Sequence, residues 1–147
     1  MRKSASLSEY VKKKNGVPLG AKHSLRNMLH RSFGASSFAR FWNFWNPIWS
    51  FYLTKFVTRP TSAHAPTWFA ILLTFFISGL FHDLVISAFY QEIYLFFTPW
   101  FGFMSLVVVL TEKFNISYER HPWVIRAIVN GSFIVSSFGI VYVTMVF

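Results

Sequence analysis

His82 and Asp83 are the residues of this 147-residue chain best suited to chemistry, because both lie deep inside a long apolar segment. Ionisable groups in such a segment are rare and costly to bury, and they usually serve a function. A helix turns by about 100° per residue, so we expect Asp83 to be poorly placed to orient the His82 ring. Ser78 and Gly79 share the face of His82. Gly79 leaves room beside the imidazole for a substrate or for another backbone.

A structural role is the alternative for both residues. His82 would then bond to a neighbouring helix, and Asp83 would cap a helix or pair elsewhere. The residues of this segment alone leave the two interpretations open.

Asn46 is the second residue of interest, and it immediately precedes Pro47. A following proline disfavours helical backbone, and proline itself suits the first position of a helix. We therefore expect Asn46 to cap a helix over 47–57, and the cap is sufficient to explain it. Three tryptophans around it recur at helical spacing, namely Trp42, Trp45 and Trp49. Such a pattern usually serves packing or interface anchoring.

The two groups of residues together match a known pattern. Phe-Trp-x-x-Trp-Asn at 41–46 is followed by Ile-Ser-Gly-Leu-Phe-His-Asp at 77–83. This order resembles the membrane-bound O-acyltransferase family, whose members carry an aromatic-rich motif ending in Asn or His and then a histidine in a buried transmembrane helix. The first motif ends in Asn46, as in the diacylglycerol and sterol acyltransferase branch. The resemblance covers about residues 38–90.

The resemblance implies transfer of an acyl group from acyl-CoA to a hydroxyl acceptor. A neutral imidazole suits removal of the acceptor proton, and burial disfavours its charged form, so His82 would be the base. Asn46 would donate to the developing oxyanion or position the histidine. The substrates would contact five further residues: Trp42, Trp45, Ser78, Gly79 and Arg40. Acyl-CoA is a co-substrate, and we expect no cofactor and no metal, because the His and carboxylate residues lack ligand spacing.

The elements that must position these residues are apolar helices. The chain is 54% hydrophobic and 13% charged, with a net charge of +9, and residues 67–111 contain no Lys or Arg. The segments at about 67–90, 93–111 and 123–147 reach the roughly 20 residues that a membrane span requires. The sequence therefore predicts an all-α, multi-pass integral membrane protein with three transmembrane helices. The absence of cysteine excludes a disulfide scaffold and a thiolate nucleophile.

Positive charge decides how the apolar segment 41–57 is placed. If it crossed the membrane, Arg59, Lys113, Arg120 and Arg126 would all lie outside, against the usual excess of positive charge in the cytoplasm. We therefore expect a re-entrant or interfacial helix there. The N-terminus is predicted to be cytoplasmic and the C-terminus to lie on the opposite side.

The first 40 residues differ sharply from the rest, since they carry nine of the fourteen Lys and Arg residues. We expect residues 1–40 to form a basic cytoplasmic arm and 41–147 the membrane domain. Ser6 and Glu9 have the spacing of a capping box, which predicts a short helix that continues into the lysines at 12–14. The expected partner of the arm is the anionic membrane lipid, not nucleic acid.

Three spans are few for the proposed chemistry, because members of the resembled family have many more, which enclose a tunnel. We therefore expect a homo-oligomer, a partner subunit or a missing N-terminal half. The alternative function is a non-catalytic membrane subunit, or a truncated or degenerate remnant that keeps the motifs as structure. A third interpretation is a membrane-surface anchor whose working part is the basic arm.

Overall fold

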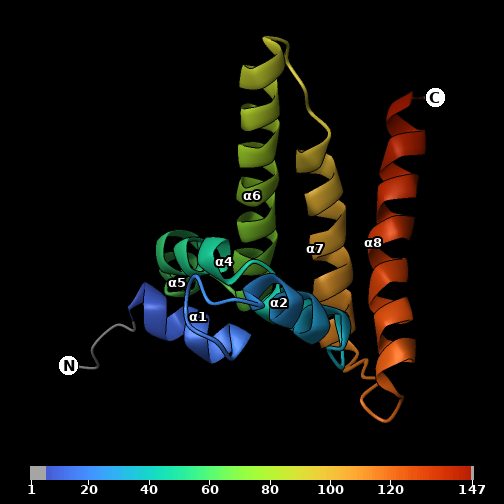
Figure 1. Ribbon diagram of the computed structural model, residues 1–147. Coiled ribbons are helices and arrows are strands. Elements are labelled where there is room, and N and C mark those ends of the chain that lie inside the picture. The colour runs from blue at the N-terminus through green and yellow to red at the C-terminus, as the bar shows by residue number, and fades with distance from the viewer. Residues whose placement is uncertain (1–5, 147) are drawn as a thin grey trace.

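The computed structural model describes residues 6–146, and every regular element among them is a helix. The first half holds short elements: α1 (Leu7–Asn15), α2 (Ser24–Phe33), α3 (Phe38–Phe44), α4 (Pro47–Leu53), the π-helical turn η1 (Thr54–Thr58) and α5 (Arg59–Ser62). Three long helices follow: α6 (Thr67–Tyr90), α7 (Phe97–Lys113) and α8 (Trp123–Val146). Figure 1 shows these three standing side by side, with the short helices gathered around one end. The all-α prediction is confirmed.

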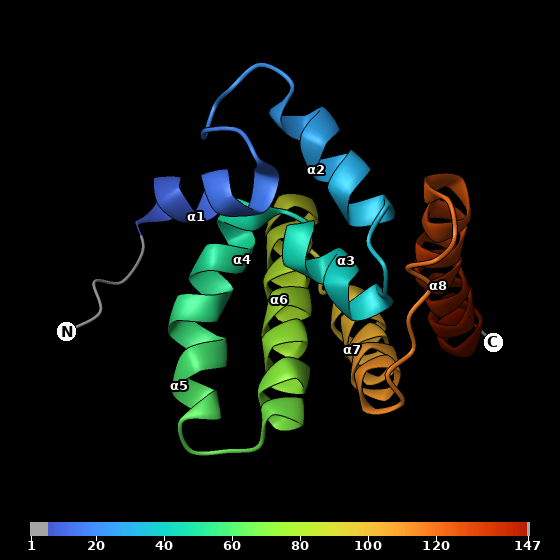
Figure 2. The ribbon, with the colours of Figure 1, turned by 90° about the horizontal axis from the view of Figure 1, so that it is seen from below.

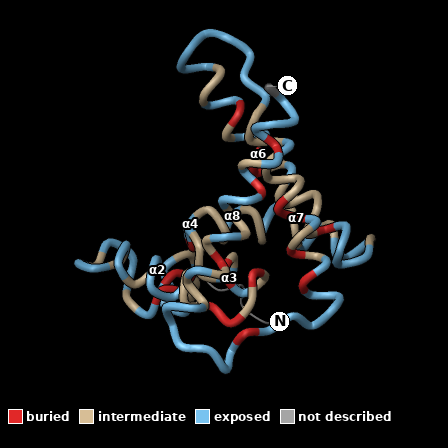
Figure 3. The backbone as a smooth tube through the Cα atoms, turned by 90° about the vertical axis from the view of Figure 1, so that its right-hand side faces the viewer, coloured by how far each residue is buried: buried red, intermediate tan, exposed pale blue. Residues whose placement is uncertain are grey.

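Two helices, α6 and α8, are long and apolar enough to cross a membrane. The 24 residues of α6 extend for about 36 Å, more than the roughly 30 Å of a hydrocarbon core. Only 22% of the most apolar part of α6 and 17% of that of α8 is buried. Figure 3 shows the far end of α6 and the loop after it as exposed. The predicted segments 67–90 and 123–147 match these two helices.

The third predicted span, 93–111, is wrong at its start. Residues 91–96 are not helical, and α7 begins at Phe97 and ends at Lys113, so that it has 17 residues. It is not among the helices long enough to cross a membrane. The physical reason is a cap from α6: the backbone amides of Phe96, Phe97 and Thr98 all donate to Asp83, and this fixes where α7 begins.

Two helices occupy the segment 41–57, where one re-entrant or interfacial helix is predicted, and the second of them begins after the predicted cap at Asn46. The chain turns at Asn46, whose φ of +39° lies in the left-handed region, and this turn separates α3 from α4. The second part continues through η1 and α5 to Ser62. It runs beside the first half of α6 (Figure 2), where the hydroxyls of Thr58 and Thr74 lie 2.9 Å apart.

The helix predicted near the N-terminus is confirmed as α1. Ser6 Oγ accepts from the Glu9 amide at 3.3 Å, and the Glu9 carboxylate accepts from the Ser6 amide at 2.8 Å. This bonding lowers the pKa of Glu9. The first five residues of the predicted arm lie outside the described residues.

In the rest of the predicted arm, α2 and α3 pack against the long helices α8 and α7, whereas α1 packs mainly against α4. The sequence did not predict α2, whose C-terminal end is held by α8: Asn130 Nδ2 donates to the carbonyl oxygens of Phe33 (2.9 Å) and Ala35 (3.0 Å). Tyr118 donates its hydroxyl to Asn130 Oδ1, and burial raises the pKa of Tyr118. The predicted domain boundary at residue 40 falls inside α3.

The core lies where α3 meets α7. Its buried members come from these two helices and from the turn before α3: Ala35, Phe38, Phe41, Met104 and Val108. Aromatic side chains surround this cluster, and they include Trp42 and Trp45. The core therefore fixes α3, and with it the two tryptophans that precede Asn46.

Candidate functional site

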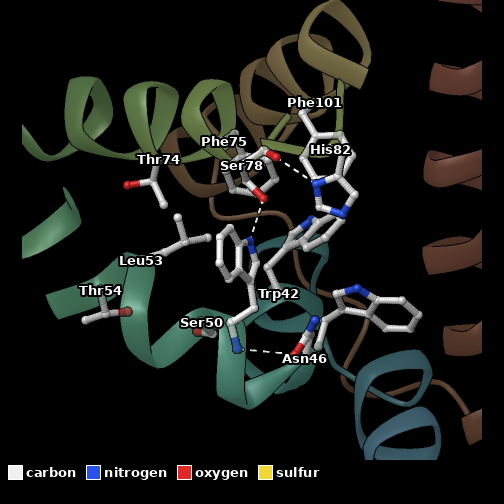
Figure 4. A pocket seen from close by; sticks show the side chains of 12 residues that line it. Trp42, Asn46, Ser50, Leu53, Thr54, Thr74, Phe75, Ser78, His82 and Phe101 are labelled. Atoms are coloured by element: carbon white, nitrogen blue, oxygen red, sulfur yellow. Dashed lines mark hydrogen bonds between the residues drawn. The ribbon is translucent and has the colours of Figure 1, made fainter. Parts of the chain in front are cut away.

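A cavity of about 120 Å³ lies between the end of α3, α4 and α6 (Figure 4). Its walls are aromatic, aliphatic and neutral polar, without a Lys, Arg, Asp or Glu side chain. The lining residues are Trp42, Trp45, Asn46, Trp49, Ser50, Leu53, Thr54, Thr74, Phe75, Ser78, His82 and Phe101. The fold thus brings together five of the predicted site residues from two motifs that are far apart in the sequence: Trp42, Trp45, Asn46, Ser78 and His82.

His82 is half-buried and oriented by its own helix. Its Nδ1 lies 2.7 Å from the backbone oxygen of Ser78. A carbonyl oxygen only accepts hydrogen bonds, so Nδ1 must donate, and in the neutral ring Nε2 then carries the lone pair. The ring packs against Phe97 and Phe101, with centroid separations of 5.5 and 5.0 Å. The arrangement leaves Nε2 able to accept a proton.

Asn46 is connected to His82 through Trp49. Asn46 Oδ1 accepts from the backbone amide of Trp49 at 3.2 Å, so the predicted helix cap is confirmed. The indole Nε1 of Trp49 donates to Ser78 Oγ at 2.9 Å, and the backbone oxygen of Ser78 holds His82. Figure 4 shows both bonds of Ser78.

Trp49 belongs to the site although the sequence did not single it out from the aromatic stripe. Its position three residues after the cap is the signal that could have found it, because the capping side chain bonds the amide at that spacing. The indole then reaches α6 and ties α4 to the helix that carries the histidine.

Trp42 and Trp45 both pack against other aromatic side chains, and Trp42 also places a polar group in the interior. Trp42 packs edge-on against Phe75 with 5.0 Å between ring centroids, and Trp45 stacks on Phe41 at 5.3 Å. Trp42 Nε1 is buried and makes no hydrogen bond to any described residue. A buried donor of this kind is unfavourable unless a partner arrives.

Gly79 and Asp83 lie outside the cavity, on the side of α6 that meets α7. A Cβ at Gly79 would lie 2.6 Å from the backbone oxygen of Phe97, so the room beside Gly79 is occupied by another backbone. The Asp83 carboxylate accepts from the amides of Phe96 (3.0 Å) and Phe97 (2.7 Å), and from both the amide (2.7 Å) and the hydroxyl (2.6 Å) of Thr98. Asp83 therefore caps α7, which is one of the roles that the sequence leaves open. It does not orient His82, in agreement with the prediction from helix geometry.

Arg40 also lies away from the histidine. It lines a second cavity on another face of α3, and its Nη1 donates to Ser36 Oγ at 3.1 Å. Among residues 6–146 no three His, Asp or Glu side chains are grouped so that they could hold a metal ion.

No protein-family model matches this chain. No curated protein matches it in sequence, and no solved structure matches it. The case for a function therefore rests on the geometry of the cavity and on the chemistry of the residues that line it.

Proposed function

We propose that the chain is an integral membrane protein in which α6, α7 and α8 cross the bilayer. Large apolar side chains on the outer faces of α6 and α8 support this, since Phe89 is 80% and Val135 is 71% exposed. In water such surfaces would be strongly unfavourable, whereas lipid covers them without cost. The 17 residues of α7 extend for only about 25 Å, and a bilayer accommodates a short span by local thinning.

The distribution of basic residues supports an orientation with the N-terminus in the cytoplasm and the C-terminus on the opposite side. Residues 67–112 and 127–147 contain no Lys or Arg. The described Lys and Arg side chains lie on the short helices, in the loop between α1 and α2, at the C-terminal end of α7, in the loop after it and in the first turn of α8. All of these lie at the same end of the molecule in Figure 1, as the excess of cytoplasmic positive charge requires.

For the cavity, we propose an O-acyltransferase activity, carried by this chain or by an assembly that contains it. The observation that carries the proposal is the bond from His82 Nδ1 to the Ser78 carbonyl, which leaves Nε2 as a base in a cavity without charged groups. Nε2 takes the proton of the acceptor hydroxyl as its oxygen attacks the thioester carbonyl of acyl-CoA. The tetrahedral intermediate then collapses: the C–S bond breaks, the thiolate takes the proton from His82, and the ester and free CoA leave.

The oxyanion of that intermediate needs hydrogen-bond donors that are already in place. The oxygen of the Asn46 carboxamide is engaged by Trp49, which orients the group and leaves its NH₂ free to donate. Trp42 Nε1 is a second donor without a partner among the described residues. We assign these two groups to the oxyanion, and Trp45 and Ser78 to the walls that hold the substrates.

The size of the cavity bears on what the complete active unit contains. At about 120 Å³ it is smaller than the roughly 300–1,000 Å³ of ordinary small-molecule sites. The acyl chain must therefore lie against lipid, a second copy or a partner subunit. The same observation favours the other candidate function, a non-catalytic membrane subunit or a degenerate remnant in which His82 serves structure alone.

Thiol release from a panel of acyl-CoAs of different chain length distinguishes the two functions. The purified protein in detergent, supplied with a lipid alcohol and a sterol as hydroxyl acceptors, is compared with His82→Ala, and with His64→Ala, which removes an exposed histidine outside the cavity. An acyltransferase predicts that His82→Ala lowers the rate by at least about 100-fold while His64→Ala leaves it unchanged. Equal rates in all three proteins, or no release by any of them, would contradict catalysis by this chain alone.

A further inference from the structure

The second cavity, on the other face of α3, collects positive charge from four parts of the chain. Its volume is about 470 Å³. Its charged and titratable lining residues come from α1, α2, α3, the loop after α7 and the first turn of α8: Lys14, His30, Arg31, Arg40, Glu119 and Arg126. Four of these are cations against the single carboxylate of Glu119, so the cavity has a net positive charge.

The fold holds these cations near one another. Arg31 Nη1 donates to the backbone oxygen of Lys14 at 2.9 Å, which fixes the guanidinium between α1 and α2. Arg40 is held by its bond to Ser36 Oγ. Arg126 Nε is buried and has no hydrogen-bond partner among the described residues. A buried guanidinium nitrogen without a partner is unfavourable, and because Arg126 lines the cavity, an anion there would offset the charge of this guanidinium.

The N-terminal end of α8 adds to this positive potential. Trp123, the first residue of this 24-residue helix, lines the cavity and stacks on His30 with 5.1 Å between ring centroids. Its indole Nε1 donates to the His30 backbone oxygen at 2.9 Å, which fixes α2 against the start of α8. The positive end of a helix dipole favours an anion in that place.

We propose that this cavity binds a phosphate group. Arginine presents a planar fork of donors that matches phosphate oxygens, and Arg40 and Arg126 provide two such forks on facing elements. In the proposed topology the cavity lies at the cytoplasmic surface, where the phosphate belongs either to the headgroup of an anionic lipid or to a soluble phosphate ester. The site is separate from the His82 cavity, so this inference does not depend on acyl transfer.

The test measures binding to the purified 147-residue chain in neutral detergent, at constant ionic strength set with chloride. The lipid probe is phosphatidic acid, with phosphatidylcholine as its uncharged counterpart, and the soluble probe is inorganic pyrophosphate. The variant Arg40→Gln/Arg126→Gln removes the two forks. The matched control Arg59→Gln/Arg120→Gln removes the same charge from two exposed arginines that do not line the cavity.

We expect at least one probe to bind the unaltered protein and the cavity variant to weaken that binding by at least about tenfold, through the loss of charge-assisted hydrogen bonds, with the control unchanged. Binding of phosphatidic acid alone identifies a lipid headgroup, and binding of pyrophosphate as well identifies a general phosphate site. Equal weakening in both double variants means diffuse surface charge and overturns the proposal, as does the absence of binding to either probe. Arg126→Lys, which keeps the charge and removes one fork, replaces the double variant if that protein does not fold, and it must weaken binding too.

Discussion

His82 and Asp83 are neighbours in one helix, yet the structure places them in opposite environments. The Asp83 side chain faces α7, is 1% exposed and accepts four hydrogen bonds. The His82 side chain is half-buried, faces the cavity and has one ring nitrogen bonded to its own helix. The carboxylate is thus saturated with donors, whereas only Nδ1 of the imidazole bonds to a described residue.

The comparison shows how a costly ionisable group inside an apolar helix can be assigned a role. Where protein groups satisfy every lone pair, as at Asp83, the residue serves the fold, because its partners account for the cost of burial. At His82, by contrast, one ring nitrogen has no bond to the protein that would compensate the cost of placing the group inside an apolar helix. A functional role explains the presence of His82 better than a structural role does. Variants of the two residues should therefore affect different properties.

The largest effect should come from His82→Gln, measured by acyl-CoA thiol release and by thermal unfolding of the same sample. Loss of a general base lowers the rate by about 10²- to 10⁴-fold. Stability should hardly change, because the Ser78 carbonyl remains in its helix. A variant that unfolds much earlier and retains its rate would reverse the assignment, and His82 would then be a structural residue.

Asp83→Ala should give the second largest effect, on stability. Three backbone amides at the start of α7 lose their acceptor, and a hydrogen bond to a charged group is worth about 1.5–3 kcal/mol. We expect a loss of at least about 3 kcal/mol, with faster amide hydrogen exchange at residues 96–98. Asp83→Asn keeps one oxygen acceptor and should lose less. Unchanged exchange at these amides would show that α7 does not need the cap.

The contrast also shows which parts of the structure could be predicted from the sequence. The bounds of α6 followed from composition alone, because the apolar run, in which His82 and Asp83 are the ionisable residues, fixes both ends. The start of α7 did not, because it depends on a carboxylate 14 residues earlier in the chain. Local patterns also identified the caps at Ser6 and Asn46, since a capping side chain lies within three residues of its partner.

Long-range packing explains the rest of what the sequence could not show. The resemblance to a known motif brought His82, Asn46 and the tryptophans into one hypothesis, and the structure places them around one cavity. It gave no reason to separate Arg40 from them, because the direction of a side chain around α3 depends on what that helix packs against. The resemblance also did not show whether the space beside Gly79 holds a substrate or another backbone. The position of α7 decides this, because the backbone of Phe97 fills that space.

Gly79→Ala tests the close contact between α6 and α7, on the side of α6 that carries Asp83. We expect it to have an intermediate effect on stability. The added methyl group would lie 2.6 Å from the Phe97 backbone oxygen, so α7 must shift, and such overpacking costs about 1–3 kcal/mol. Gly102→Ala is the matched control, because a methyl group added there would meet no neighbouring atom within 4 Å; it should be neutral or slightly stabilising. Equal unfolding midpoints for the two variants would mean that α6 and α7 are not in close backbone contact.

The smallest effect should come from Ser78→Ala, which tests the connection between the two motifs on the side of His82. The substitution removes the hydroxyl that accepts from Trp49 Nε1 and keeps the backbone oxygen that orients the imidazole. We expect a loss of stability of about 1 kcal/mol and a thiol-release rate much closer to that of the unaltered protein than to that of His82→Gln. Trp49→Phe removes the same bond from the other side, so adding Ser78→Ala to it should have little further effect on that bond. If Ser78→Ala instead abolished thiol release, the hydroxyl itself would belong to the chemistry, and His82 would not be acting as the only proton acceptor in the cavity.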